Sequence, residues 1–533
     1  MVEYPRRLGF VSGLLSPHRH KRGASHQVSD QSSSNSSSPT PRPLPDNLPN
    51  NSFLSLGRKE GKKEMASRWS GQTNKWERHR RVKDESTLSL PPPLGPECNS
   101  IAVTEVLSAD ARWKTDDARI TNCKLVATYS WLDRSNPWII VPGAPARWAP
   151  PRQVVKLKQD AGTYYRDKNA SRHPDHPWEP TVEAVMRMNC IEGEKVGPID
   201  LVACGSTLGN LLRFVRGEGR QFRMLVEVVG STVHLIRREN SPKEIIPDVH
   251  GYGHSFPEAY TEWDGDVRGS ASHQRILRYE FAGLGCLVRF EGDGYLPEKS
   301  ESILKKKQDQ DGAKGEERST ASLETISDKL ATAHVASVTP QTDANSNSLQ
   351  VSFRGRVVPQ EAMFDLKTRS IKRDPEQVVA EELPRLWLAQ IPNFILARHQ
   401  FGFFNDIQIK DVREEVRAWE SANADALLRF ARLLHRIVDV ARDREDGKME
   451  ILGEEDQPRL KILEQLPDVR SALPGKVALR WESWLCETAA HRDSESDETD
   501  STDSISEWVD LANDGDFTYC SDECGYCGQC NRI

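Results

Sequence analysis

The sequence predicts an α+β domain in which a mixed β-sheet is flanked by helices. Short apolar runs with strand-like alternation, such as 222–229 and 232–237, mix with segments whose apolar residues recur at helical spacing, such as 422–440. The pair Gly230-Ser231 between the first two runs is typical of a tight hairpin turn. Both periodicities within one stretch of chain favour α+β over an all-helical or all-strand fold.

Composition divides the 533 residues into three parts. Residues 1–110 are basic and rich in Ser and Pro, and they hold too few apolar residues to offset the entropy of ordering, so we expect disorder there. Residues 111–490 hold enough apolar residues for one sizeable core, with 455–484 expected as a weak helical end. The low-complexity stretch 298–349 is expected to be a disordered insert, which costs little because closure entropy grows slowly with loop length. Residues 491–533 form an acidic tail.

Charge and hydropathy restrict the partners. Residues 59–83 are basic with Trp69 and Trp76 interleaved, a pattern that suits a single-stranded nucleic acid, although a solvated linker fits the same residues at least as well. The low-complexity ends are also candidate sites for a protein partner. The chain has no apolar run of the ~20 residues that a membrane helix needs, so we expect no membrane contact. Its first residues lack the apolar centre of a secretory signal, and we therefore expect a nuclear or cytoplasmic protein that is not secreted.

Two acidic pieces carry the chemistry, and each follows a strand-like apolar run. Glu291 and Asp293 form one pair, and Asp365 and Lys367 form the other. A strand points residues i and i+2 to one face, so each pair is expected to share a face. If the two strands are neighbours in one sheet, three carboxylates and an ammonium converge on a site for a hard divalent cation. Solvated strand faces are the alternative, because such short patterns arise often by chance.

The order of these pieces is similar to that in a known family. The pieces are, along the chain, Asp200 to Ser206, the hairpin at 222–237, Gly251-Tyr252 ahead of Glu258, Glu291-Gly292-Asp293, Asp365-Leu366-Lys367, and Trp387 with Gln390. Over residues 160–440 this order resembles the decapping exoribonuclease (DXO-like) family, as a divergent fungal-type branch. The resemblance implies a nuclease-like fold of the PD-(D/E)xK type, in which a mixed sheet is flanked by helices.

The resemblance also implies a reaction, the removal of incomplete or unusual caps from RNA 5′ ends and degradation of the RNA behind them. It implies Mg²⁺ or Mn²⁺ as cofactor. The implied metal ligands are Glu258, Glu291, Asp293 and Asp365. The residues implied to act in catalysis are Lys367, Gln390 and Glu258, with Lys367 orienting the attacking water or stabilising the negative charge that develops.

The sequence departs from the family pattern at two positions. Asp365 stands where the family usually has Glu, and Cys204 stands where it has an Arg. Arg166 or Arg213 are the candidates for the missing phosphate-binding arginine. A non-catalytic RNA- or protein-binding member of the same fold is therefore the alternative function.

Proteins of this branch are sometimes labelled geranylgeranyl pyrophosphate synthetase, and a prenyl synthase is the third reading of the sequence. Prenyl synthases need an Asp-Asp-x-x-Asp motif on facing helices. The pair Asp116-Asp117 is followed by Ile120 where the third Asp is required, and the long all-helical pattern is missing. The residues therefore argue against that label.

Four cysteines gather near the end of the chain. They are Cys520, Cys524, Cys527 and Cys530. Four closely spaced thiolates suit tetrahedral Zn²⁺, and an iron–sulfur cluster is an alternative. The bland interpretation is a flexible tail with incidental cysteines. Because these four cluster in a chain with ten cysteines, we predict a second, zinc-like metal site there.

Overall fold

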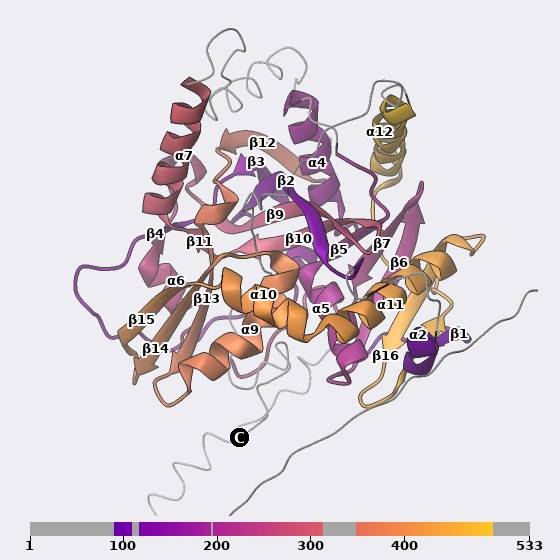
Figure 1. The fold of residues 1–533 in the computed structure, drawn as a ribbon, viewed down its shortest axis with the longest axis horizontal. Helices are drawn as coiled ribbons and strands as arrows, with labels where there is room; N and C mark the ends of the chain where they lie inside the picture. Colours follow the sequence, from indigo (N-terminus) through magenta and orange to yellow (C-terminus); the bar gives the residue numbers. More distant parts are fainter. Residues whose placement is uncertain (1–89, 109–113, 115–116, 193–195, 313–347, 494–533) are drawn as a thin grey trace, which may run out of the picture. The chain divides into compact units, whose positions relative to one another are not determined.

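The computed structural model describes residues 90–108, 114, 117–192, 196–312 and 348–493. Within these residues the strands form two mixed sheets, one of eleven strands and one of six (Figure 1). The eleven-stranded sheet has the order β1 (Glu97–Ala102), β17 (Arg459–Leu463), β16 (Lys448–Gly453), β6 (Phe222–Val229), β7 (Thr232–Arg237), β5 (Leu201–Cys204), β10 (Leu284–Gly292), β9 (Ser270–Phe281), β2 (Ile120–Leu132), β3 (Trp138–Gly143), β12 (Gln350–Gly355). The six-stranded sheet has the order β15 (Phe403–Asp411), β14 (Asn393–Gln400), β13 (Met363–Ser370), β11 (Gly294–Tyr295), β4 (Arg147–Trp148), β8 (Thr261–Glu262).

Helices cover the faces of these sheets. The helices are α2 (Val103–Ser108), α3 (Lys168–Arg172), α4 (Glu179–Glu192), α5 (Gly205–Arg216), α6 (Ser255–Tyr260), α7 (Pro297–Gly312), α9 (Pro375–Ala389), α10 (Arg413–Ala422), α11 (Ala424–Arg442) and α12 (Gly475–Asp493), with short 3-10 turns at Gly265–Val267 and Gln360–Ala362. The prediction of mixed sheets flanked by helices is confirmed. None of the described helices is both long and apolar enough to cross a membrane.

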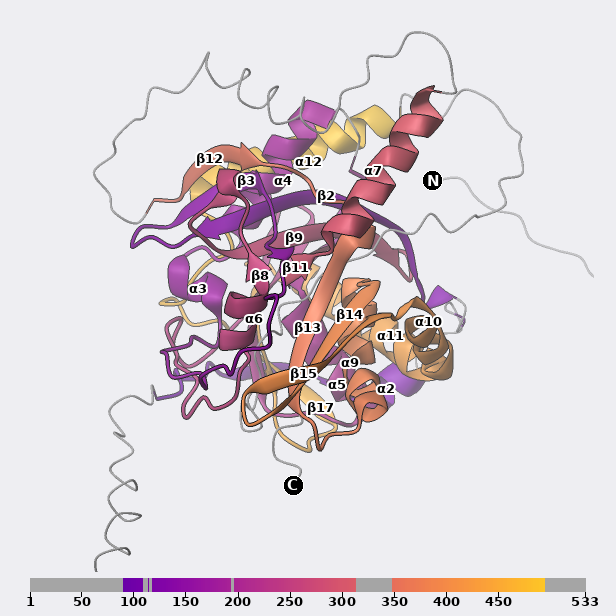
Figure 2. The same cartoon turned by 90° about the vertical axis from the view of Figure 1, so that its left-hand side faces the viewer.

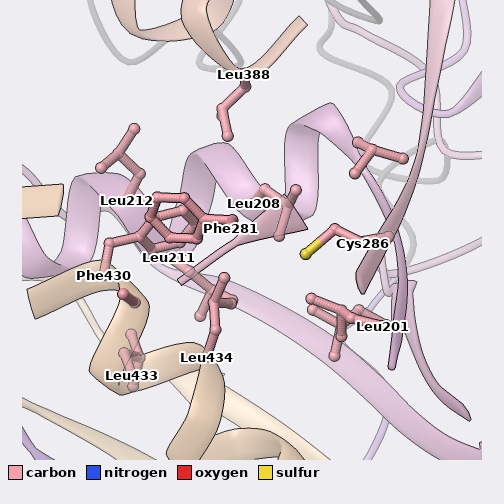
Figure 3. Close-up of a cluster of buried hydrophobic side chains, with 14 of the residues drawn as sticks. Leu201, Leu208, Leu211, Leu212, Phe281, Cys286, Leu388, Phe430, Leu433 and Leu434 are labelled. Atoms are coloured by element: carbon pink, nitrogen blue, oxygen red, sulfur yellow. The ribbon is translucent and has the colours of Figure 1, made fainter. Parts of the chain in front are cut away.

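The largest core lies between the eleven-stranded sheet and the helices α5, α9 and α11. Leucines at helical spacing on α5 and α11 face apolar side chains of β5, β9 and β10 (Figure 3). Leu211 and Leu434 are fully or almost fully buried in this contact, as is Phe281 of β9. A second core lies on the opposite face, where α4 and α12 pack with Trp178 and Trp481. Both faces of the central strands are therefore covered, which is why β5 is apolar throughout and β10 is apolar from Leu284 to Val288.

Local signals in the sequence account for several element boundaries. The hairpin of β6 and β7 turns at Gly230, which has a φ of 61°. Helix α9 begins after Asp374, whose side chain accepts a hydrogen bond from the Gln377 backbone N–H, and Pro375 occupies its first turn. The helix ends at Gln390, which adopts a left-handed conformation with a φ of 56°.

Three expectations differ from the structure. β1 and α2 fall inside the range 1–110, where composition predicts disorder; β1 is ordered because it pairs antiparallel with β17. The strand β17 itself lies in 455–484, expected as helix. The insert 298–349 begins as helix α7, which Lys299 ties down by an ammonium contact of 2.5 Å to the Asn393 side chain. All three depend on partners far away in the sequence, which local composition does not encode.

The two acidic strands also lie in different sheets, contrary to the expectation of one sheet. β10 belongs to the eleven-stranded sheet and β13 to the six-stranded one. The chain passes from β10 to β11 through the single residue Asp293, and β11 then pairs with β13. The two acidic pieces are consequently brought together at the point where the chain leaves the eleven-stranded sheet and enters the six-stranded one.

Gly294 is the residue that makes this crossing sterically possible. A Cβ at this position would lie 2.4 Å from the Phe364 ring and 2.7 Å from the Ala146 carbonyl oxygen. We predict that Gly294→Ala lowers the free energy of unfolding by ~1–3 kcal/mol, because neither the buried ring nor the backbone oxygen can move freely. Urea denaturation measures this.

Gly475→Ala is the matched control, because a Cβ there meets nothing within 4 Å. It is expected to change stability by no more than about 0.5 kcal/mol. Equal stability of the Gly294→Ala and Gly475→Ala proteins would contradict the close packing at the crossing.

Candidate functional site

Asp293 sits at the crossing between the two sheets, beside β13. Its Oδ2 accepts a hydrogen bond of 2.7 Å from the Leu366 backbone N–H. The next residue, Gly294, pairs with Phe364 across the β11–β13 ladder. This register places the Asp293 carboxylate next to Asp365, the first acidic residue of β13.

Alternation along β13 divides its side chains between two environments. Phe364 and Leu366 join an apolar cluster with α6 on one face. Asp365 and Lys367 point to the other face, toward α9, and are almost completely buried. Figure 2 shows β13 running between α6 and α9. The sequence pattern of an acidic residue followed two positions later by Lys therefore does place both side chains on one face.

A network of buried charges joins β13 to α9. Arg385 forms an ion pair with Asp365 Oδ1, and its Nε donates to Glu382 Oε2 at 3.0 Å. Lys367 Nζ lies 3.2 Å from Glu382 Oε1, and Arg369 Nη2 lies 3.7 Å from the same oxygen. Burial lowers the pKa of Arg385, but Asp365 and Glu382 raise it more, so the guanidinium stays charged.

Sequence reasoning missed Glu382 and Arg385. Both lie on the side of α9 that also buries Val378 and Leu386. A Glu and an Arg three residues apart on the apolar side of a helix are a signal of a buried ion pair. That signal is visible in the sequence, although the partner Asp365 is not.

Two carboxylate oxygens of the cluster have no hydrogen-bond partner within the part of the chain that the structure describes. These are Asp293 Oδ1 and Asp365 Oδ2, and both are buried. Burial raises the pKa of Asp293 well above its ordinary value, and repulsion from Asp365 raises it further, against the opposing effects of Arg385 and the Leu366 N–H. Burial likewise raises the pKa of Asp365, although Arg385 opposes the shift. The two carboxylates thus form a pair that favours an added proton or an added cation.

The donor set fits Mg²⁺ or Mn²⁺ when substrate and water complete the shell. Among the described residues no group of three or more His, Cys, Asp or Glu side chains is arranged to hold a metal. Mg²⁺, however, is usually bound through one or two carboxylates together with substrate phosphates and water, rather than by a complete protein cage. The unpartnered oxygens of Asp293 and Asp365 are hard ligands of that type.

Glu291 joins the acidic pair from the side of α3. Its negative charge contributes to the raised pKa of Asp293, so the two carboxylates act on each other. Its Oε1 accepts from Lys168 Nζ at 2.8 Å. Opposite Glu291 in the β9–β10 ladder lies Gln274, which is fully buried and whose amide O and N have no partner among the described residues. The sequence pattern does not point to Lys168 or Gln274, since both reach Glu291 only through the fold.

Lys168 also lines a cavity of about 390 Å³ between the β2–β3 turn and α3. Its walls carry four cations, two carboxylates and two aromatic rings: Arg134, Lys168, Arg172 and Lys243; Asp133 and Asp175; Trp131 and Tyr165. Burial lowers the pKa of Arg172, while Asp133, Glu291 and Tyr165 raise it, which shows how near the cavity comes to Glu291. The arrangement suits an anionic ligand with a planar group.

The remaining predicted residues lie elsewhere in the described structure. Glu258 is exposed on α6, and its charge contributes to the raised pKa of Tyr164, of which burial is the main cause. The Gln390 side chain donates to the Trp387 carbonyl at 2.7 Å and so caps α9. Arg166 pairs with Glu244 at 2.9 Å.

The other candidate arginine lies on α5. Arg213 donates to Asn210 one turn earlier at 2.5 Å. Cys204, the residue that replaces the family's arginine, is the buried N-cap of the same helix, with its sulfur 3.0 Å from the Ser206 hydroxyl. Cys520, Cys524, Cys527 and Cys530 lie outside the described residues, so the zinc-like site stays a prediction.

Comparison with known proteins gives one family and a set of solved structures. The family model described as "Domain of unknown function (DUF8563)" matches residues 111–480. No curated protein matches the sequence.

The structure is similar to three solved proteins, among others. S. pombe Rai1, crystallised with 3′-FADP, is 9% identical with a TM-score of 0.41, over 69% of this chain and 99% of that one. Scheffersomyces stipitis Rai1, with (3′-NADP)⁺ and calcium, is 10% identical with a TM-score of 0.44, over 74% and 100%. Candida albicans Rai1, with pU5-Mn²⁺, is 10% identical with a TM-score of 0.41, over 75% and 99%.

The raised pKa of Asp293 predicts how stability depends on pH. A carboxyl whose pKa is higher in the folded state binds its proton more tightly there, so stability is lost as pH rises through the folded-state pKa. We therefore expect Asp293→Asn, without divalent cations, to be more stable than wild type by about 1 kcal/mol near pH 8 and equal to it near pH 4. Thermal melts across this range measure the gap. A gap that does not change with pH would contradict a buried, ionisable Asp293.

Arg385 is predicted to hold the cluster together. Arg385→Met leaves Asp365 and Glu382 buried without their main cation, which is expected to cost roughly 3–5 kcal/mol. Arg436→Met, at an exposed position of α11, is the matched control and should cost less than about 0.5 kcal/mol. Urea denaturation of both proteins decides, and equal losses would show that the Asp365–Arg385 pair contributes nothing.

Proposed function

We propose that this chain, which belongs to the DUF8563 family, is a divalent-metal-dependent hydrolase that acts on phosphate bonds at the 5′ ends of RNA. The observation that carries the proposal is the pair Asp293 and Asp365, each with a buried, unpartnered carboxylate oxygen, at the crossing between the sheets. Paired carboxylates in this state bind Mg²⁺ or Mn²⁺ together with substrate phosphate. The cationic cavity, which the Lys168–Glu291 ion pair connects to the acidic cluster, is the proposed binding place for that phosphate.

The residues of the cluster have distinct tasks in this proposal. Asp293 and Asp365 hold the metal, which when bound activates water and neutralises charge at the leaving oxygen. Lys367 and Arg385 are held by Glu382 and act as fixed positive charges that stabilise the negative charge of the transition state.

RNA 5′ ends are proposed as substrate for two reasons. The cavity combines guanidinium and ammonium groups with the half-exposed ring of Tyr165, which suits a phosphorylated nucleoside. The ordered pieces of sequence at 160–440 resemble those of decapping exoribonucleases. A hydrolysis assay with capped, 5′-triphosphate and 5′-monophosphate RNA shows which of these 5′ ends the protein prefers.

A non-catalytic RNA-binding protein is the second candidate, and one observation favours it. Each carboxylate of the cluster has cations close by, and four negative charges face four positive ones: Glu291, Asp293, Asp365 and Glu382 against Lys168, Lys367, Arg369 and Arg385. A cluster that is formally neutral without a metal has less need of one. The two candidates differ in turnover and not in RNA binding.

The test is hydrolysis of 5′-triphosphate, capped and 5′-monophosphate RNA with Mn²⁺. We predict that Asp293→Asn lowers kcat/KM by about 100-fold or more, because it removes the negative charge of a metal ligand. Asp439→Asn, at an exposed position of α11, should keep wild-type activity. Since Asp293→Asn is expected to be at least as stable as wild type, unfolding does not account for such a loss. Equally low turnover of all three proteins, with RNA binding intact, would favour the binding protein.

A further inference from the structure

We propose that Lys168 exchanges partners, leaving Glu291 for a phosphate group of a nucleotide in the cavity, so that nucleotide binding releases Glu291 toward the divalent cation. The inference rests on the metal site proposed above and adds a coupling between anion and cation. Nothing in the residues of the metal pair alone requires such a coupling. It follows from where Lys168 stands.

Lys168 stands between the cavity and the carboxylates. Its ammonium lies 2.8 Å from Glu291 Oε1, while its side chain is 29% exposed and lines the cavity wall. Glu291 is by contrast only 6% exposed at its side chain. One end of this ion pair is therefore open to an incoming ligand and the other is closed off, so only the lysine side of the pair can be reached from the cavity.

The backbone under Lys168 is fixed, which leaves the side chain as the moving part. Lys168 is the first residue of α3, and the preceding Asp167 caps that helix by accepting from the Ala170 backbone N–H at 2.9 Å. A lysine carries its charge on a flexible four-carbon stem and can turn its ammonium between two anions without backbone motion.

The cavity offers a phosphate more than Lys168 alone. Arg172 reaches the same space, with its Nη1 donating to the Leu132 carbonyl at 3.0 Å and its Nη2 only 3.8 Å from Asp133. Tyr165, 38% exposed, provides a ring on which a base can stack. A nucleotide phosphate between Arg172 and Lys168 would compete with Glu291 for the ammonium.

Electrostatics links the exchange to the cation. If Lys168 turned away alone, Glu291 would be a buried carboxylate without its cation, which is strongly unfavourable. A divalent cation near Asp293 compensates that charge, because the Glu291 and Asp293 carboxylates already act on each other. Gln274, buried opposite Glu291, can then donate its amide N–H to the released carboxylate and position it. Nucleotide and cation therefore strengthen each other's binding, and the coupling is reciprocal.

Calorimetric titration of Mn²⁺ into the full chain, with and without saturating adenosine 5′-monophosphate, tests the exchange. For wild type we expect the nucleotide to tighten Mn²⁺ binding about fivefold or more. For Lys168→Met we expect Mn²⁺ alone to bind more tightly than to wild type, since Glu291 has no internal cation. We expect the nucleotide to tighten that affinity by a clearly smaller factor than in wild type, because only direct contact between phosphate and cation remains. Lys476→Met, exposed at the start of α12, is the control and should behave as wild type.

The outcomes separate this inference from the proposed function. Coupling as large in Lys168→Met as in wild type would come from direct contact between cation and phosphate alone, and would overturn the exchange while the metal site stands. Mn²⁺ binding to wild type that ignores the nucleotide would overturn the exchange as well. No Mn²⁺ binding to any variant would overturn both. Lys168→Arg, which keeps the charge and guards against misfolding of the Met variant, should retain the coupling.

Discussion

The ion pair between Asp365 and Arg385 is the interaction on which the arrangement of the site depends. Asp365 belongs to the six-stranded sheet, whereas Arg385 lies on α9, which packs into the core of the eleven-stranded sheet. The pair therefore joins the two sheets at the place where the chain crosses between them. Buried charges are tolerated only when they are compensated. Each carboxylate at this crossing is therefore expected either to pair with a cationic side chain or to have an oxygen free for a bound cation.

Both forms of charge compensation occur in the site. Arg385 and Lys367 compensate Asp365 and Glu382 from within the protein. The oxygens Asp293 Oδ1 and Asp365 Oδ2 stay without a partner among the described residues, and these are the positions where a cation from outside is favoured. Glu291 lies between the two cases, because its present cation, Lys168, is also within reach of a ligand in the cavity. This intermediate position is the reason why we propose Lys168 as the link between substrate and metal.

Much of the fold could be predicted where the signal is local. The β6–β7 hairpin has the bounds that its alternation and its Gly230 turn predict, and the shared face of Asp365 and Lys367 follows from strand geometry. What depends on distant partners could not be predicted. The order of β1 comes from β17, more than three hundred residues away in sequence, and the division into two sheets comes from one crossing residue.

The same limit applies to the site. Sequence order pointed to Asp293 and Asp365, which meet, and to Glu258, which lies exposed on α6. It did not point to Arg385 or Lys168, because their roles arise from packing of α9 and α3 against the acidic strands.

The central claim is that the Asp293–Asp365 pair holds a divalent cation. Anomalous diffraction from crystals of the full chain grown with Mn²⁺ and adenosine 5′-monophosphate tests it most directly. We expect an anomalous peak in contact with both carboxylates, and no such peak in crystals of Asp293→Asn. An anomalous map without a peak between these carboxylates, at Mn²⁺ concentrations that saturate ordinary carboxylate sites, would contradict the account and leave Arg385 as the cation of the site.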